Sequence, residues 1–261
     1  MEVRLDGRVA LVTGGSKGLG YAMAHKFAES GAEVCLWART EPEVRAAAQQ
    51  ITQETGAKGL GIACDVSQAD QINSAFNQTL ASFGRVDILI NNAGFAKAGS
   101  FESITDEEWQ MDFDLKLMAA VRLSRLVFPG MKERRWGRII NMLNTLAKTP
   151  SAGSAPTSVT RAAGMALTKV LAGEGAPHNI LVNGFNIGLI KSDQIKRAYE
   201  SKQREASFDE FVEKAGARAV PLGRYGEADE CASLACLLCS DNCGFVSGTA
   251  INIDGNMSPA L

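Results

Sequence analysis

The sequence predicts an α/β fold, in which a doubly wound parallel sheet of seven strands carries helices on both faces. Three observations support this fold class. Strand-like and helix-like segments alternate along the whole chain, a glycine-rich turn joins the first two of them, and no linker or repeat divides the sequence. With 261 residues, 46% of them hydrophobic, the chain can bury one sizeable core, so we expect a single domain over residues 1–261.

The expected elements follow from local residue patterns. Short β-branched or apolar runs predict the strands, and between them lie stretches in which apolar residues recur with helical spacing. The expected strands are 8–12, 33–37, 60–63, 87–90, 138–141, 180–183 and 250–253. The clearest expected helices are 19–29, 71–83, 115–131 and 161–173. A charged stretch over about residues 187–217 delays the last strand, and we expect it to form a helical flap near the substrate opening.

The charge pattern argues against two kinds of partner. The 27 basic and 29 acidic residues are scattered and give a net charge of −2, so no basic patch marks the chain for nucleic acid or an anionic membrane. The first six residues are charged rather than apolar, and no apolar run approaches the roughly 18 residues that a membrane span needs. We therefore expect a cytoplasmic protein with no nucleic-acid or membrane partner.

One pair of cysteines, Cys236 and Cys239, has the C-x-x-C spacing of metal and redox sites. The pair has no second pair or nearby histidine to complete a ligand set, and it falls in an apolar helical stretch. Cysteine in such a stretch behaves as a small hydrophobic residue. We expect these thiols to pack in the core, and we expect no metal site.

A glycine-rich turn, Thr13-Gly-Gly-Ser-Lys-Gly-Leu-Gly20, leads from the first strand into the first helix. Gly14 permits a tight turn, Gly18 lets the backbone approach a pyrophosphate, and Gly20 allows close packing of the helix. Amide groups at the helix N-terminus favour an anion there. The turn therefore predicts a dinucleotide site. The other turn residues expected at this site are Ser16, Lys17 and Leu19.

The end of the second strand indicates which nicotinamide cofactor is preferred. An acidic residue at this point pairs with the free ribose hydroxyls of NAD, but here the chain reads Trp37-Ala38-Arg39. Arg39 and Lys17 together place two cations where a 2′-phosphate would lie. We therefore expect NADP(H) rather than NAD(H).

The glycine-rich turn and three further motifs resemble those of the classical short-chain dehydrogenase/reductase family. The resemblance extends over essentially the whole chain. The further motifs are Asn91-Asn-Ala-Gly94, Pro221-Leu-Gly-Arg224 and the terminal Gly248-x-x-x-x-x-x-Asp254-Gly255. The resemblance implies a Rossmann-like fold, a nicotinamide cofactor and a homo-oligomer, tetramer or dimer, built on the long helices 115–131 and 161–173. The further cofactor contacts that it implies are Asp65, Val66, Asn92, Ala93, Gly94, Arg161 and Gly188.

The resemblance fails at the family's catalytic residues, which are a Tyr-x-x-x-Lys pair, a serine and an asparagine. The three tyrosines of the chain are Tyr21, Tyr199 and Tyr225, and none has a lysine four residues later. An ungapped alignment puts other residue types at all four catalytic positions. These are Thr157 for tyrosine, Arg161 for lysine, Asn144 for serine and Asp114 for asparagine.

The four replacements change what the site can do. In the family, the lysine ammonium lowers the pKa of the tyrosine so that the phenol can donate a proton near neutral pH. A threonine hydroxyl at position 157 cannot take this role, and Arg161 cannot exchange a proton. Arg161 can still hold the nicotinamide ribose, with Asp114 orienting it through a charge-assisted pair. Asn144 and Thr157 can each donate a hydrogen bond to a carbonyl. The candidates for a substitute acid are Tyr199, Lys191, Asp193 and Lys97. Two histidines, His25 and His178, are expected to be structural.

Three functions are compatible with these residues. The first is an NADP(H)-dependent short-chain oxidoreductase with an atypical active site, whose small-molecule substrate is a carbonyl compound or secondary alcohol. The second is a catalytically inactive NADP(H)-binding protein, either a pseudoenzyme or a sensor. The third is a non-redox enzyme similar to the halohydrin dehalogenases, which carry arginine at the lysine position. Those enzymes retain serine and tyrosine and lose the glycine pattern, the reverse of this chain, so we favour the first function.

Overall fold

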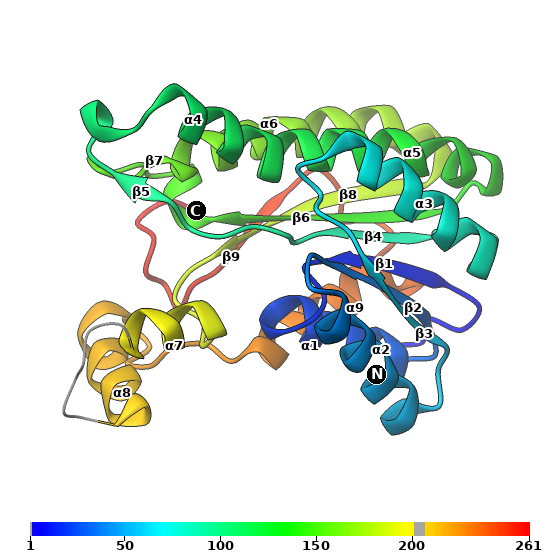
Figure 1. The fold of residues 1–261 in the computed structure, drawn as a ribbon, viewed down its shortest axis with the longest axis horizontal. Helices are drawn as coiled ribbons and strands as arrows, with labels where there is room; N and C mark the ends of the chain where they lie inside the picture. Colours follow the sequence, from blue (N-terminus) through cyan, green and yellow to red (C-terminus); the bar gives the residue numbers. More distant parts are fainter. Residues whose placement is uncertain (1, 201–206) are drawn as a thin grey trace.

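The residues described by the computed structural model, 2–200 and 207–261, form one seven-stranded sheet between two helical layers (Figure 1). The strand order is β3-β2-β1-β4-β6-β8-β9, and every neighbouring pair is parallel. The chain therefore starts in the middle of the sheet, builds one half outward and then crosses back to build the other. In sheets of this type, ligands bind at the strand ends where the winding reverses, which here is between β1 and β4.

The seven strands expected from the sequence are confirmed. Their bounds are β1 Val9–Thr13, β2 Glu33–Ala38, β3 Gly59–Ala63, β4 Ile88–Asn91, β6 Gly137–Asn144, β8 Ile180–Ile187 and β9 Ala250–Ile253. The largest differences are the carboxyl ends of β6 and β8, which extend three and four residues beyond the expected 138–141 and 180–183. A short antiparallel pair, β5 (Ala98–Gly99) with β7 (Ala155–Pro156), was not expected.

The helices form two layers and cover both faces of the sheet (Figure 1). On one face lie α1 (Gly18–Glu29), α2 (Glu41–Thr55) and α9 (Ala228–Cys239). On the other face lie α3 (Ala69–Phe83), α5 (Ala119–Arg134) and α6 (Thr157–Gly175). The remaining helices are α4 (Asp106–Phe113), α7 (Asp193–Glu200) and α8 (Phe208–Ala219).

The alternating side chains of the strands fill two separate cores. Along β2, Leu36 contributes to the core with α1, α2 and α9, whereas its neighbours Cys35 and Trp37 contribute to the core with α3 and α5. Successive strand residues point to opposite faces of a sheet, so a strand covered on both sides is apolar throughout. This is why the buried strands read as continuous apolar runs.

The cysteines behave as the sequence predicts. Cys236 and Cys239 lie on α9, are buried in the core and are free thiols. Burial raises the pKa of both thiols, so neither is a reactive thiolate near neutral pH. Packing in the core is therefore confirmed for this C-x-x-C pair. In the described part of the chain, no group of three or more His, Cys, Asp or Glu side chains could hold a metal ion.

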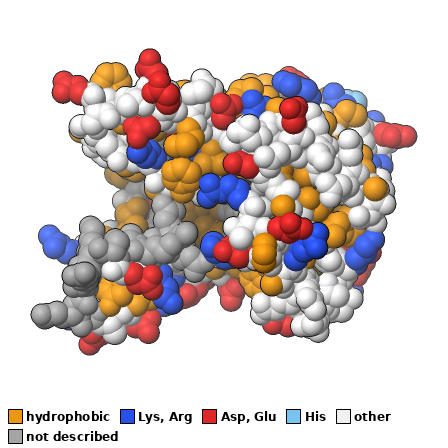
Figure 2. Space-filling model, viewed as in Figure 1, with side chains coloured by type: hydrophobic (Ala, Val, Ile, Leu, Met, Phe, Trp, Pro, Cys, Tyr) orange, Lys and Arg blue, Asp and Glu red, His pale blue; other side chains and the backbone are white. Residues whose placement is uncertain are grey.

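The charged stretch expected to form a flap contains α7 and α8, apart from residues 201–206, which lie outside the described residues. Val212 of α8 packs with Val220 and Tyr225 in a small third core. Figure 2 shows a hollow between this part of the molecule and the part that carries α4, β5 and β7. A movement of α7 and α8 over that hollow stays a prediction. None of the described helices is both long and apolar enough to span a membrane.

Candidate functional site

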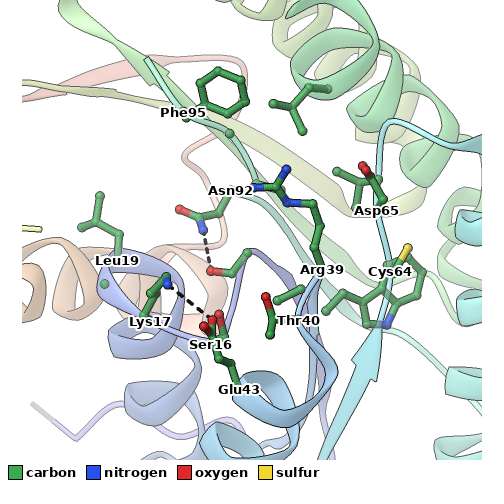
Figure 3. A pocket seen from close by; sticks show the side chains of 18 of the residues that line it. Ser16, Lys17, Leu19, Arg39, Thr40, Glu43, Cys64, Asp65, Asn92 and Phe95 are labelled. Atoms are coloured by element: carbon green, nitrogen blue, oxygen red, sulfur yellow. Dashed lines mark hydrogen bonds and ion pairs between the residues drawn. The ribbon is translucent and has the colours of Figure 1, made fainter. Parts of the chain in front are cut away.

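A cavity of about 420 Å³ lies at the carboxyl ends of β1, β2, β3 and β4 (Figure 3). It is the place where the winding of the sheet reverses, as expected for a ligand site in this fold, and we call it the nucleotide cavity after the ligand that the sequence predicts. Predicted cofactor contacts that line it are Gly14, Ser16, Lys17, Gly18, Leu19, Arg39, Asp65, Val66, Asn92, Ala93 and Gly94. Sequence reasoning did not identify the remaining lining residues, Trp37, Ala38, Thr40, Glu43, Cys64, Phe95, Leu115 and Ser192.

The glycine turn has the backbone geometry that its sequence predicts. Gly14 and Gly18 adopt φ angles of +64° and +57°, in the left-handed region that favours glycine. A Cβ atom on Gly20 would meet the carbonyl oxygen of Gly14, so the helix can start here only without a side chain. By contrast, nothing lies within 4 Å of a Cβ position at Gly18. The turn thus combines close internal packing with open space at the residue expected beside a pyrophosphate.

Thr13 and Asn92 fix the turn to β4. Thr13 Oγ1 accepts hydrogen bonds from the backbone amides of Asn92 and Ala93, both at 3.0 Å. The Asn92 amide group donates in return to the carbonyl oxygens of Thr13 at 2.9 Å and Gly14 at 3.2 Å. The Asn92 side-chain nitrogen is therefore used to hold the two loops together.

The two predicted cations differ in their surroundings. Lys17 forms an ion pair with Glu43 at 3.3 Å. Arg39 is exposed and lines the cavity, and with the residues that the structure describes it makes no ion pair or side-chain hydrogen bond. Figure 3 shows its side chain extending into the cavity above Thr40. Arg39 is thus the cation with its guanidinium available to a ligand.

Gly188 is a predicted cofactor contact whose role stays a prediction. It follows the end of β8 and does not line the cavity. A Cβ atom at Gly188 would come within 2.6 Å of Asp254 Cβ. The structure therefore gives glycine at this position a packing reason, which is the close approach of the chain after β9.

A second polar cluster lies behind Gly94, around the start of α6. Its members are Asp112 at the end of α4, Lys116 in a π-helical turn (Asp114–Met118) before α5, and Thr157 and Thr160 of α6. All four side chains are buried. Lys116 Nζ donates to Asp112 Oδ1 and, at 2.7 Å, to Thr157 Oγ1. Thr160 Oγ1 donates to Asp112 Oδ2 at 2.7 Å.

The hydroxyl group of Thr157 is fully engaged within the protein. Its oxygen accepts hydrogen bonds from Lys116 Nζ and from the backbone amide of Lys97 at 3.0 Å, and its proton goes to the Lys97 carbonyl oxygen at 2.7 Å. Pairing of β5 with β7 holds the Lys97 segment against the start of α6. The expectation that Thr157 donates to a substrate carbonyl is therefore not met in this structure.

The expected pair between Asp114 and Arg161 is wrong. Asp114 instead accepts hydrogen bonds from Gln110 at 2.8 Å and from Arg122 at 3.0 Å. The side chain that this helical segment directs at Thr157 is Lys116, two residues later. The ungapped alignment put Asp114 at the asparagine position, whereas the structure places Lys116, in the same π-helical turn, at the contact with Thr157.

Neither Arg161 nor Asn144 lines the nucleotide cavity, but Arg161 lies beside Gly94, which does. Arg161 Nη1 donates to the Met142 carbonyl oxygen at 2.5 Å, and a Cβ atom at Gly94 would lie 2.8 Å from its Nη2. Burial lowers the pKa of Arg161 to about 10, against the opposing charge of Asp112, so the guanidinium stays protonated at neutral pH. Asn144 ends β6, and its buried Oδ1 has no hydrogen-bond partner in the described structure. A buried amide oxygen of this kind is suited to a ligand hydroxyl group.

The suggested substitute acids have partners of their own. Lys97 pairs with Glu108 at 2.6 Å and Lys191 with Glu227 at 2.5 Å. Tyr199 of α7 contacts the rings of Phe208 and Phe211. The Asp193 side chain lies outside the described residues.

The two histidines lie away from the nucleotide cavity. His25 lies on α1 and pairs with Glu54 at 2.9 Å, and His178 lies before β8. Neither histidine lines the nucleotide cavity.

Comparisons with known proteins agree with this architecture. A family model described as Enoyl-(Acyl carrier protein) reductase matches residues 14–258. The 3-oxoacyl-(acyl-carrier-protein) reductase FabG of Aquifex aeolicus (strain VF5) is 31% identical over 257 residues, which are 98% of this chain and 100% of that protein. FabG of Escherichia coli (strain K12) is 34% identical over 255 residues, 98% of this chain and 99% of that protein. The crystal structure of L-sorbose reductase from Gluconobacter frateurii, complexed with NADPH and L-sorbose, has a TM-score of 0.95 and 35% identity, with 100% of both chains covered.

The fold and these relatives place the chain among the oxidoreductases that are built on a doubly wound parallel sheet. The chain belongs to the short-chain dehydrogenase/reductase family, whose members are NAD(P)-dependent oxidoreductases.

Proposed function

We propose that the chain is an NADP(H)-dependent oxidoreductase that interconverts a carbonyl compound and a secondary alcohol at an atypical active site. The observation that carries the cofactor assignment is Arg39, an exposed cation without an ion pair among the described residues, which lines the cavity at the end of β2. The residue before it, Ala38, is not acidic, so nothing at the end of β2 repels a 2′-phosphate. The L-sorbose reductase structure, which contains NADPH, supports the same choice.

The residues of the cavity fit a dinucleotide. The open space beside Gly18 and the N-terminus of α1 would receive the pyrophosphate, and Arg39 with Lys17 would receive the 2′-phosphate. Asp65 and Val66 line the cavity beyond Arg39, where the adenine would lie. Arg161, beside Gly94, would hold the nicotinamide ribose. When bound, the nicotinamide supplies or accepts the hydride.

The substrate would lie in the hollow beside the nicotinamide end of the cavity. Asn144 is a polar group suited to contact the alcohol form of the substrate, because its buried Oδ1 is unpaired in the described structure and can accept a hydrogen bond from the hydroxyl group. Arg161 adds positive charge that would stabilise a developing oxyanion. The chain has no Tyr-x-x-x-Lys pair, so the proton must have another source.

One observation favours an inactive NADP(H)-binding protein as the alternative. The hydroxyl proton of Thr157, at the position of the family's tyrosine, is engaged by the Lys97 carbonyl oxygen. A protein that only binds the nucleotide would tolerate this arrangement, because the nucleotide cavity does not include Thr157. Catalysis therefore has to be tested separately from binding.

The deciding experiment measures both properties on the same preparation. NADPH and NADH affinities are measured by fluorescence titration, and we expect NADPH to bind at least about tenfold more tightly, about 1.4 kcal/mol. NADPH consumption is then followed with L-sorbose, with a 3-oxoacyl thioester and with a panel of simple ketones. Reduction of any of them supports the enzyme. Tight NADPH binding with no reduction supports the inactive alternative, and equal affinities for the two nucleotides would overturn the cofactor assignment.

The chain also has features of a homo-oligomer, which we propose as its state in solution. The side chains of Val159 and Val170, both on α6, are 45% and 56% exposed. They are 11 residues apart, close to three helical turns, and therefore lie on one face of the helix. Large apolar side chains aligned on an exposed helix face indicate a contact with a second copy.

A further inference from the structure

The least expected group near the active site is the ammonium of Lys116. The residue is 6% exposed, and it lies in the π-helical turn between α4 and α5. Its Nζ donates to Asp112 Oδ1 and to Thr157 Oγ1, so two of its three protons are directed to protein groups. Taking an ammonium out of water is costly, and buried lysines with shifted pKa values are concentrated at functional sites.

Lys116 lies directly behind the wall of the nucleotide cavity. A Cβ atom at Gly94, a lining residue, would be 2.8 Å from Arg161 Nη2 and 3.6 Å from Lys116 Cγ. The Lys116 ammonium is 5.8 Å from the centre of the Phe95 ring, and Phe95 also lines the cavity. Phe95 is 37% exposed and appears at the upper end of the cavity in Figure 3. The ammonium is thus one side chain away from the nicotinamide end.

The charges around Lys116 come from three elements. Asp112 of α4 is its ion-pair partner, Arg161 of α6 is a second cation nearby, and the Lys97–Glu108 pair lies beyond Thr157. Burial lowers the pKa of Lys116, and Arg161 acts in the same direction, whereas Asp112 opposes both. A lysine whose pKa moves toward neutrality becomes a better proton donor and acceptor at the pH of the cell.

We propose that Lys116 supplies the proton in carbonyl reduction, in place of the family's tyrosine. This role rests on the proposed function, which provides the hydride. The hydride forms a C–H bond at the carbonyl carbon, and the π-electron pair of the C=O bond moves to oxygen. That oxygen forms an O–H bond with a proton from the Lys116 ammonium, whose N–H bond breaks and leaves a neutral amine. Water returns a proton to the amine after the alcohol leaves, and in the oxidation direction the neutral amine accepts the proton.

The neighbours of Lys116 have positioning roles in this scheme. Asp112 fixes the ammonium, and Thr160 holds the second carboxylate oxygen of Asp112. Thr157 accepts from the ammonium but cannot pass on its own proton, because that proton is bonded to the Lys97 carbonyl oxygen. Phe95 lines the cavity with its ring centre 5.8 Å from the ammonium, so a substrate that reaches Lys116 from the cavity would pass beside this ring.

The test compares Lys116→Arg and Lys116→Met with the wild type, using NADPH and whichever of L-sorbose, the 3-oxoacyl thioester or the ketones the wild type reduces. Both variants should lose activity by roughly 10²–10⁴-fold. Methionine has no proton to donate, and arginine keeps the charge without releasing a proton near neutral pH. Both should bind NADPH with wild-type affinity, because Lys116 does not line the cavity. Lys132→Arg, an exposed lysine of α5, is the matched control and should behave as wild type.

A pH profile separates proton donation from a structural role. Reduction by the wild type should fall as the pH rises through the pKa of Lys116, and Asp112→Asn should move that fall to lower pH, because it removes the charge that stabilises the ammonium. NMR of ¹⁵N-labelled lysine, assigned with Lys116→Arg, should show the same pKa without turnover. Near-wild-type activity of Lys116→Arg, or a Lys116 signal with an ordinary lysine pKa, would overturn the proton-donor role alone. A wild type that binds NADPH and reduces none of the compounds would count against the proposed function and this role together.

Discussion

The ammonium of Lys116 lies 2.7 Å from the hydroxyl oxygen of Thr157, and this contact joins the turn before α5 to the start of α6. The ungapped alignment puts Thr157 at the position of the family's tyrosine, and a phenol ring at this position would extend well beyond the threonine hydroxyl group. The buried ammonium therefore lies next to the space that such a ring would need. The two residues are in direct contact, so a substitution at one changes the surroundings of the other.

This relationship predicts how the family's usual chemistry can be restored. The triple variant Asn144→Ser, Thr157→Tyr and Arg161→Lys should gain little reductase activity, because the new phenol meets the Lys116 ammonium. Adding Lys116→Asn should raise activity on simple ketones at least about tenfold above the triple variant, since a phenol beside a lysine can then protonate the oxyanion. The reductase activities of the triple variant and of the variant that also carries Lys116→Asn are measured as NADPH consumption. Equal activity of the two variants would show that Lys116 does not compete for the space of the phenol.

Much of the fold and of the nucleotide site could be predicted from the sequence, because both depend on local patterns. Buried strands are continuous apolar runs, and Gly14 and Gly18 are needed for backbone angles that other residues rarely adopt. The residues that line the cavity follow strand ends, and their meeting at one edge is a property of any parallel sheet.

The catalytic region was predicted less well, because its arrangement depends on features without a local signature. A π-helical turn sets which of Asp114 and Lys116 points at Thr157, and its apolar neighbours give no sign of it. The two-residue strands β5 and β7, which hold the Lys97 segment against Thr157, are too short to show alternation.

Arg39 should decide the preference between the two nicotinamide cofactors. We expect Arg39→Ala to weaken NADPH binding by about tenfold, about 1.4 kcal/mol, and to leave NADH binding unchanged, because the 2′-phosphate is the only difference between the two. Fluorescence titration measures both affinities. Arg45→Ala is a matched control, because Arg45 is an exposed arginine of α2 that pairs with Glu41 and does not line the cavity. An unchanged NADPH affinity in Arg39→Ala would remove the basis for the cofactor assignment.

The exposed valines of α6 should lie in a contact between copies of the chain. The double variant Val159→Glu and Val170→Glu introduces a charge at both ends of this face, and burying an unpaired charge is strongly unfavourable. Light scattering at micromolar concentration should give a multiple of the monomer mass for the wild type and a smaller particle for the variant. A wild-type monomer at this concentration would contradict the proposal. Circular dichroism should show that the variant keeps its helices.

Glu230, in the first turn of α9, should make a small contribution to stability that depends on pH. Its carboxylate accepts hydrogen bonds from Arg224 at 2.7 and 2.8 Å and from the Glu227 backbone amide at 2.8 Å. The Arg224 hydrogen bonds, followed by the amide, lower the pKa of Glu230 from 4.5 to about 2. A carboxyl group whose pKa is lower in the folded state stabilises the protein above its unfolded pKa. The contribution is therefore complete above about pH 4.5, and it is lost as the pH falls toward 2.

We therefore expect Glu230→Gln to lower the melting temperature at pH 7 by about 1–3 °C. The pair is largely exposed and so contributes no more than about 1 kcal/mol, which for a chain of this size corresponds to a few degrees. The difference between variant and wild type should shrink as the pH is lowered from 4.5 toward 2, because both then carry a neutral side chain at position 230. Differential scanning calorimetry at several pH values measures this difference. Glu133→Gln, an exposed residue of α5 outside every ion pair found in the described residues, is the control and should show no such trend. If the difference at pH 7 persisted unchanged into acid, the Arg224–Glu230 pair would not be its cause.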